Sequence, residues 1–361
     1  MHLVASLAAH GWHPAAWRVT GKTGFDGVAP FRTMAWTAER GGLDAILLGL
    51  PTVARAERSR GIDNLHLDPL PLLGAMIAAT QHIGLCGYWP ADIAEPYHVA
   101  RVFATLDHLA GGRTGWIAGL AGPVELAEHF QRLDLPTSGP EAEARLVELI
   151  DVARQLWDSW EDGSFVVDQS TATFSDSEKV HPIDHAGRFF TVRGPLNVPR
   201  PVQGQPVIFY RDRPSAPVVP GVEVVLAQCA TIAEAKVRRA TWQELGSVHF
   251  IARVMPILAD TEAAAAKRAA DLDVLVPAVG TSAPRFVGTP QKFAAWMSEW
   301  HAAGACDGFD VLPAVSTVDL DLVVDAVVPL LRQQGLRPAG YGGPILRDLL
   351  GLPRPASRFA A

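Results

Sequence analysis

The sequence predicts an α/β protein folded as a (β/α)8 TIM barrel, with a β-hairpin excursion inserted in it. Strand and helix patterns alternate from one end of the 361 residues to the other, which favours a parallel sheet. About eight such units favour a sheet that closes on itself. A doubly wound sheet is the alternative, but no Gly-x-Gly-x-x-Gly fingerprint follows any predicted strand. We therefore expect a single barrel domain over residues 1–361.

The first 90 residues supply three short apolar strands and two helices between them. The strand segments are bounded by polar or glycine-containing turns, and the helical segments repeat apolar residues every three or four positions. We expect strands at residues 3–9, 45–49 and 83–88, and helices at residues 31–40 and 70–80.

Residues 95–118 carry a helix, a glycine turn and a buried strand in direct succession. Pro96 lies in the first helical turn, where its missing N–H is harmless. Gly111 and Gly112 then predict a left-handed cap that ends the helix. The run that follows, residues 114–118, is expected to be the next strand.

The rest of the chain continues the alternation after one interruption. An amphipathic helix is expected at residues 146–160, followed by an excursion at 161–205 rich in Asp, Ser, Gly and Pro, in which residues 187–194 alternate like a hairpin. Further strands are expected at 206–210, 223–227, 249–258 and 308–312, with helices at 262–272, 290–303 and 320–334. Residues 335–361 are expected to pack along the barrel or at a subunit contact.

Composition limits the function classes. The net charge is -7, whereas a nucleic-acid partner normally requires a basic face. No apolar run reaches the ~18 residues of a membrane helix. The apolar stretch at residues 3–9 has no basic residue before it, unlike a secretion signal. The three scattered cysteines fit no disulfide framework, so we expect a cytoplasmic protein without a nucleic-acid or membrane partner.

A series of motifs resembles the flavin-dependent monooxygenases of the bacterial-luciferase superfamily. The similarity is greatest to the branch that oxidises nitrilotriacetate, EDTA and dibenzothiophene sulfone. The motifs follow one another in the family's order, with the strongest block at residues 179–200. The matching segments are residues 11–18, 37–46, 95–116, 156–162, 179–200, 287–290, 307–313 and 349–353.

This resemblance implies a barrel that holds FMN non-covalently at the carboxyl ends of its strands. Reduced FMN, supplied by a separate flavin reductase, would react with O2 and oxygenate a small organic substrate. The flavin carries the redox chemistry, and the protein positions it and excludes water. The resemblance also implies a homodimer.

Several polar positions of the family are altered in this chain. The family's Asp after the second strand aligns with Leu50, and the Asn of its Trp-Asn pair, which follows a Gly, aligns with Ile117. A His and a Tyr that usually reach the flavin phosphate align with Gly139 and Glu143. A His that often precedes Val-Gly-Thr-Pro aligns with Ala283. The small-residue turn for the phosphate is shortened to residues 211–215, where Arg211 and Arg213 are possible cationic substitutes.

Eight residues near predicted strand or helix ends are candidate cofactor contacts. Histidines there could contact flavin or substrate, the aromatic side chains could line a pocket, and Arg211 and Ser215 belong to the shortened turn. Hydrogen bonding within loops and aromatic packing in the core are the structural alternatives. The candidates are His13, Leu50, Tyr88, Trp89, His98, Ile117, Arg211 and Ser215. The spacing of residues along the chain identifies no catalytic residue. The histidine-containing block 181–185 fits no zinc-binding pattern, so no metal is expected.

Two other functions remain open. The altered positions would also suit a degenerate paralogue that binds no flavin and acts as a partner subunit or small-molecule binder. A barrel that uses the deazaflavin F420, as a distant branch of the superfamily does, is a third hypothesis.

Overall fold

Eight parallel strands form a closed barrel, as the sequence predicts. The computed structural model describes residues 1–21, 27–49, 67–120, 135–136, 138–213, 216–276 and 283–359. Each strand pairs with the next around the ring, and the last strand pairs with the first, from His2 opposite Gly308 to Ala5 opposite Val311. In ring order the strands are β1 (His2–Leu7), β2 (Ala45–Leu48), β3 (Gly84–Pro90), β4 (Thr114–Gly119), β9 (Val207–Arg211), β10 (Val224–Ala227), β11 (His249–Leu258) and β13 (Gly308–Val311). A further strand, β12 (Arg285–Gly288), pairs with the second half of β11.

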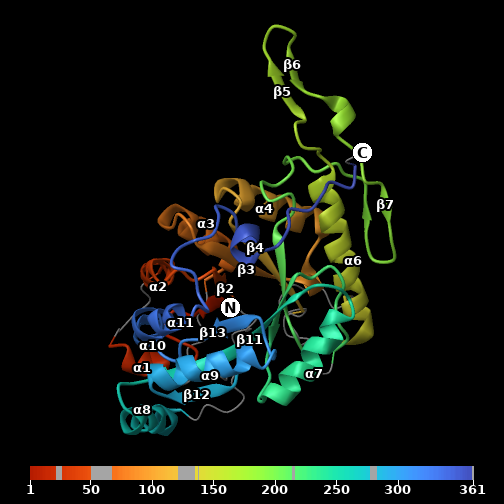
Figure 1. The fold of residues 1–361 in the computed structure, drawn as a ribbon. Helices are drawn as coiled ribbons and strands as arrows, with labels where there is room; N and C mark the ends of the chain where they lie inside the picture. The colour runs from red at the N-terminus through yellow and green to blue at the C-terminus, as the bar shows by residue number, and fades with distance from the viewer. Residues whose placement is uncertain are drawn as a thin grey trace.

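Helices surround this barrel on its outside (Figure 1). Where the sequence predicts a helix, its bounds agree to within a few residues, except that α6 begins seven residues before the expected start at residue 146. Helices α1 and α7 are not among the helices expected from the sequence. The longer helices are α2 (Ala29–Arg40), α3 (Pro69–Ala79), α4 (Pro96–Leu109), α6 (Gly139–Asp158), α7 (Ile232–Gln243), α8 (Glu262–Leu275) and α9 (Pro290–Ala302). Helices α10 (Ser316–Leu322) and α11 (Val328–Gln333) are joined by a π-helical segment at Val323–Val327, and α1 (Ala16–Val19) is a single turn.

The turn between α4 and β4 has the predicted conformation. Gly111 and Gly112 have φ angles of 61° and 88°, which side chains rarely adopt. A Cβ atom on Gly112 would also lie 2.5 Å from the Ile345 side chain. Both the backbone conformation and the lack of space therefore favour glycine at residue 112.

Alternate residues of each strand face the inside of the barrel and the outer helix layer. On β9, Val207 and Phe209 belong to the inner apolar cluster, whereas Ile208 and Tyr210 belong to the outer one. The same alternation on β1, β3, β11 and β13 places the polar side chains of Ser6, Tyr88, Arg253 and Asp310 on the inner face of the barrel.

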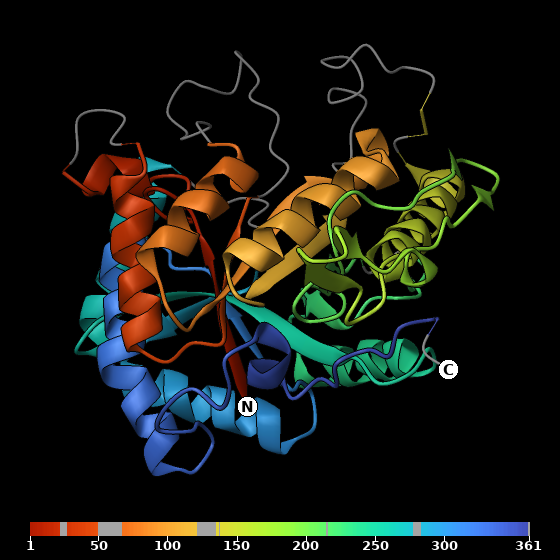
Figure 2. The same cartoon turned by 90° about the horizontal axis from the view of Figure 1, so that it is seen from above.

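The C-terminal segment closes the amino end of the barrel. Its helix α12 (Leu346–Leu350) places Leu346 and Leu350 in the inner apolar cluster. A Cβ atom on Gly84 would lie 2.4 Å from Leu346 Cδ1. Arg347 is buried and fastens the helix through an ion pair of 2.8 Å with Glu223. In Figure 2 this dark blue segment lies at the same end of the barrel as the N-terminus.

The inserted excursion between α6 and β9 contains two small antiparallel hairpins. One pairs β5 (Phe165–Asp168) with β6 (Thr173–Ser175), and the other pairs β7 (His185–Ala186) with β8 (Thr191–Val192). The β5–β6 hairpin projects away from the barrel (Figure 1). No helix among the described residues is both long and apolar enough to cross a membrane.

Candidate active site

Five polar side chains lie on inward-facing positions near the carboxyl ends of the barrel strands. Parallel strands bring these ends together at one edge, which is where barrel enzymes hold their ligands. We call this set the mouth cluster; it consists of Ser6, Tyr88, Arg211, Arg253 and Asp310.

An ion pair between Arg253 and Asp310 lies at the base of the mouth cluster. Arg253 Nε donates to Asp310 Oδ2 at 2.9 Å, and the two side chains are 1% and 0% exposed. Ser6 donates two further hydrogen bonds to the Asp310 carboxylate, one from its hydroxyl at 2.9 Å and one from its backbone N–H at 3.0 Å. Burial raises the pKa of Asp310, although Arg253 and Ser6 oppose the shift. The carboxylate is therefore held by three donors.

Arg211 differs from Arg253 because no carboxylate of the described residues forms an ion pair with it. It is the last residue of β9 and follows the inward-facing Val207 and Phe209 at the same two-residue period. Its side chain is half-buried, and in the part of the chain that the structure describes no group accepts a hydrogen bond or ion pair from it. Burial and the nearby Arg253 lower its pKa to about 10. The guanidinium thus remains charged at neutral pH.

Tyr88 and Ile117 form an apolar wall beside this cation. They are paired across β3 and β4, and both belong to the inner cluster with Phe209. The Tyr88 hydroxyl donates to the Gly119 carbonyl at 3.3 Å, and burial raises the pKa of the phenol well above its usual value. The structure thus brings three of the predicted site residues, Tyr88, Ile117 and Arg211, to one place.

The turn after β9, predicted to replace the phosphate turn, is largely occupied by ion pairs. Asp212 accepts two hydrogen bonds from Arg238, at 2.6 and 2.8 Å. Arg213 pairs with Glu143 of α6 at 2.8 Å. The cation and the acid that the sequence places near the expected phosphate site therefore neutralise each other. Ser215 lies outside the described residues.

Three other predicted site residues, His13, Trp89 and His98, do not belong to the mouth cluster. His13 is buried; its Nε2 is 3.2 Å from Asp273 Oδ1, and burial lowers its pKa. Trp89 alternates with Tyr88 and therefore faces the outer layer, with its ring centroid 6.5 Å from that of Phe103. His98 is exposed in the first turn of α4. Leu50 lies outside the described residues.

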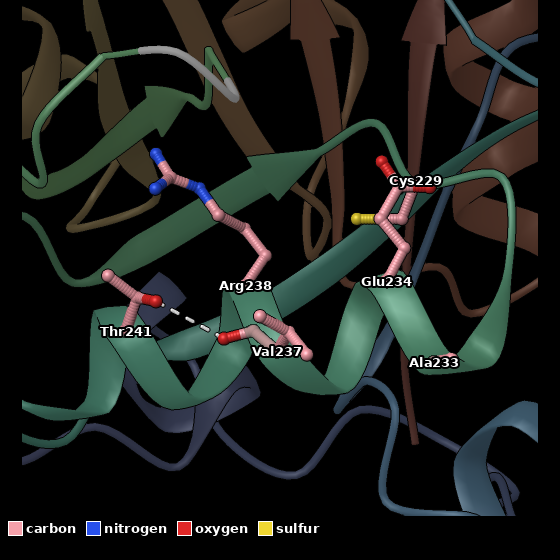
Figure 3. A pocket seen from close by; sticks show the side chains of 6 residues that line it. All are labelled: Cys229, Ala233, Glu234, Val237, Arg238 and Thr241. Atoms are coloured by element: carbon pink, nitrogen blue, oxygen red, sulfur yellow. Dashed lines mark hydrogen bonds between the residues drawn. The ribbon is translucent and has the colours of Figure 1, made fainter.

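A cavity of about 500 Å³ lies outside the barrel, along α7 (Figure 3). Its charged side chains are already engaged, because Arg238 binds Asp212 and Glu234 accepts from the Ala230 N–H at 2.7 Å. Burial raises the pKa of Cys229 to about 12, so its thiol is protonated and a poor nucleophile. This cavity offers no reactive group, and the mouth cluster is the better candidate site.

The described residues contain no group of three His, Cys, Asp or Glu side chains that could hold a metal ion. Within the block at 181–185, His181 pairs with Glu161 at 2.7 Å and His185 pairs with Glu148 at 3.1 Å. Both histidines therefore fasten the excursion.

Sequence reasoning missed Ser6, Arg253 and Asp310. A usable sign was present, because Arg253 and Asp310 each interrupt an otherwise apolar strand. A charged residue on an inward position of a buried strand requires a partner of opposite charge. A search for such interruptions would have proposed that these two residues pair.

Comparison with known proteins gives the family. The model of the luciferase-like monooxygenase family matches residues 8–272, which is well over half of the chain. The chain belongs to the luciferase-like monooxygenase family. It is therefore an oxidoreductase of the monooxygenase type.

Curated relatives of this luciferase-like monooxygenase cover nearly the whole chain. N-acetyl-S-(2-succino)cysteine monooxygenase of Bacillus subtilis (strain 168) is 30% identical, with 98% of this chain and 97% of the relative covered. Nitrilotriacetate monooxygenase component A of Aminobacter aminovorans is 32% identical, with 90% of each covered. A pristinamycin IIA synthase subunit of Streptomyces pristinaespiralis is 34% identical, with 90% of this chain and 88% of the relative covered.

Solved structures support the same fold. EDTA monooxygenase from Chelativorans sp. BNC1 matches with a TM-score of 0.85 and 24% identity, over 98% of both chains. A riboflavin lyase bound to a modified FMN matches with a TM-score of 0.86 and 24% identity, over 99% of this chain and 97% of that one. The nitrilotriacetate enzyme, at 32% identity, confirms the branch predicted from the sequence.

Proposed function

We propose that this protein is a two-component monooxygenase that uses reduced FMN and O2 to oxygenate a small organic substrate. A separate flavin reductase supplies the reduced FMN, and two copies of the chain form the working enzyme. Family membership supports the reaction type, and the FMN in the riboflavin lyase structure supports the choice of flavin. When bound, the flavin provides two electrons, so that one oxygen atom of O2 enters the substrate and the other leaves as water.

The observation that carries this proposal is the position of the charged groups inside the barrel. Arg211, Arg253 and Asp310 meet at the carboxyl end, whereas Leu346 and Leu350 fill the amino end. Among the described residues, this buried charged cluster therefore lies at the end at which barrel enzymes bind cofactors.

The residues of the mouth fit a flat ligand that carries negative charge. Tyr88, Ile117 and Phe209 offer apolar surface, and Arg211 offers a cation without an acidic partner among the described residues. Arg211 would hold a negatively charged part of the cofactor, while the apolar side chains would contact its rings. The Arg213–Glu143 pair, at 2.8 Å, would have to open before Arg213 could bind the phosphate.

The ion pair at the base of the mouth cluster has a positioning role. Ser6 holds the Asp310 carboxylate, and this carboxylate holds the Arg253 side chain, so that its charge stays fixed relative to Arg211. Fixed charges need no reorganisation when charge develops in a reaction, which is the electrostatic advantage of an enzyme site over water. The buried apolar wall excludes water from the reacting atoms.

The experiment is an anaerobic titration of the purified protein with reduced FMN, followed by mixing with oxygenated buffer. Micromolar or tighter binding, and an oxygen-dependent product from a test panel of sulfur and amine compounds, would support the proposal. Absence of binding to both reduced and oxidised FMN would overturn it. Tighter binding of F420 than of FMN would instead favour the deazaflavin hypothesis.

A second candidate function, a partner subunit, is favoured by the alignment lengths. The alignment with the pristinamycin IIA synthase subunit is only 324 positions long and covers 90% of this chain. The nitrilotriacetate enzyme needs 413 positions, more than the 361 residues of this chain, so it carries segments that this chain lacks. A chain that binds FMN only after mixing with a flavin-competent homologue would favour this role. FMN binding by the chain alone would exclude it.

A further inference from the structure

We propose that Arg211 is the residue that binds a singly charged, planar oxyanion in the barrel mouth. This inference rests on the proposed function, because it names the charge of the ligand that the site takes. Its chemistry is that of a carboxylate of the substrate or of the negatively charged ring of the reduced flavin.

The charge balance of the mouth cluster is the first argument. Two guanidinium groups, of Arg211 and Arg253, face a single carboxylate, that of Asp310, which is already bound at 2.9 Å to Arg253. Arg253 also has a further interaction, so the charge left without a partner among the described residues is that of Arg211. Removing such a charge from water is unfavourable unless a partner of opposite charge is present, so a ligand with one negative charge would complete the site.

The geometry of β9 identifies Arg211 as the group that meets this ligand. Arg253 lies in the middle of β11, is 1% exposed and is held by Asp310. Arg211 ends its strand and is half-buried, so it lies at the carboxyl edge of the barrel and is less enclosed than Arg253. The next two charged side chains are unavailable, because Asp212 is bound by Arg238 and Arg213 by Glu143.

The side chains around Arg211 set the shape of the ligand. A guanidinium group forms two parallel hydrogen bonds with a planar oxyanion. Its neighbours Tyr88 and Ile117 are apolar and almost completely buried, so a ligand with an apolar part next to its charged group suits these surroundings. Benzoate has both properties, and benzamide is its neutral match.

The test compares the wild-type protein with Arg211→Gln, Arg211→Lys and Arg188→Gln. The last variant removes an equal charge at an exposed position, where Arg188 is paired with Glu141 and 67% exposed. One arm measures the affinities for benzoate and benzamide by calorimetry. The other arm measures the affinities for reduced and oxidised FMN under anaerobic conditions. Circular dichroism and thermal unfolding establish that each variant is folded.

We expect wild-type protein to bind benzoate more tightly than benzamide, or reduced FMN more tightly than oxidised FMN. Arg211→Gln should abolish this preference through a loss of about 10- to 100-fold, as when a hydrogen bond to a charged group is lost. Arg211→Lys should retain part of it, and Arg188→Gln should retain all of it. A loss confined to benzoate identifies a substrate carboxylate, and a loss confined to reduced FMN identifies the flavin ring.

Two results would overturn the assignment. One is an Arg211→Gln variant with wild-type affinities in both arms. The other is an equal loss for reduced and oxidised FMN with no change for benzoate, since this would place the flavin phosphate on Arg211. If no protein binds FMN but benzoate binding depends on Arg211, the oxyanion site stands and the flavin function fails.

Discussion

Arg253 and Asp310 face each other across neighbouring strands of the barrel, with their side chains 2.9 Å apart and almost completely buried. Such a pair contributes little net stability when both members are present, but one member left alone is costly. Here the second arginine of the mouth, Arg211, increases that cost.

Substitution Asp310→Asn should therefore strongly destabilise the protein. It keeps the side-chain shape but removes the carboxylate with which Arg253 pairs, so we expect a loss of about 3–5 kcal/mol in the free energy of unfolding. Urea unfolding measures this loss. The double variant Arg253→Met/Asp310→Asn should lose less than Asp310→Asn alone, and an equal or greater loss in the double variant would contradict the role of the pair.

Closure of the amino end by α12 predicts a second effect on stability. Leu346→Ala should cost about 2–5 kcal/mol, because it opens a cavity in a buried site that is 0% exposed. Leu109→Ala is the matched control, since Leu109 is 65% exposed at the end of α4. If the two variants unfold at the same urea concentration, α12 does not close the barrel in the way described.

Stability should fall as the pH decreases below about 6.5, the usual pKa of histidine. Burial lowers the pKa of His249, and so does the nearby His2; burial also lowers the pKa of His13. In this pH range the unfolded chain takes up protons before the folded chain does, so acid favours unfolding by up to ~1.4 kcal/mol per pH unit for one proton. His249→Gln should make the dependence shallower between pH 6.5 and 5.5. An unchanged slope in urea unfolding would refute the assignment.

The outer cavity along α7 should be dispensable for ligand binding. Val237, at 71% exposure, lines this cavity on the outer face of the helix (Figure 3). We expect Val237→Asp to change the stability by no more than about 0.5 kcal/mol and to leave FMN affinity unchanged. A tenfold weaker affinity in the same anaerobic titration would move the candidate site from the mouth to this cavity.

Most barrel strands could be predicted from the sequence because they are short apolar runs between turns. The start of α6 could not, because its first half buries polar groups. Arg145 is buried there, donates to the carbonyls of Ala91 and Ala94, and lies 4.6 Å from the Phe190 ring centroid. These partners come from distant parts of the chain, so helical periodicity does not reveal the buried face.

The candidate site was predictable only in part, for a similar reason. The end of β9 and the inward position of Tyr88 follow from strand alternation, which is a local property. The pairing of Arg213 with Glu143 joins residues 70 positions apart, and the lack of a partner at Arg211 among the described residues is a property of the folded barrel. Neither can be read from spacing along the chain.

The most direct measurement of the central claim is the stoichiometry of reduced FMN bound by the purified chain alone, in an anaerobic titration. We predict that each chain binds one reduced FMN with micromolar or tighter affinity. A protein that is folded by circular dichroism but binds no flavin in either oxidation state would contradict it.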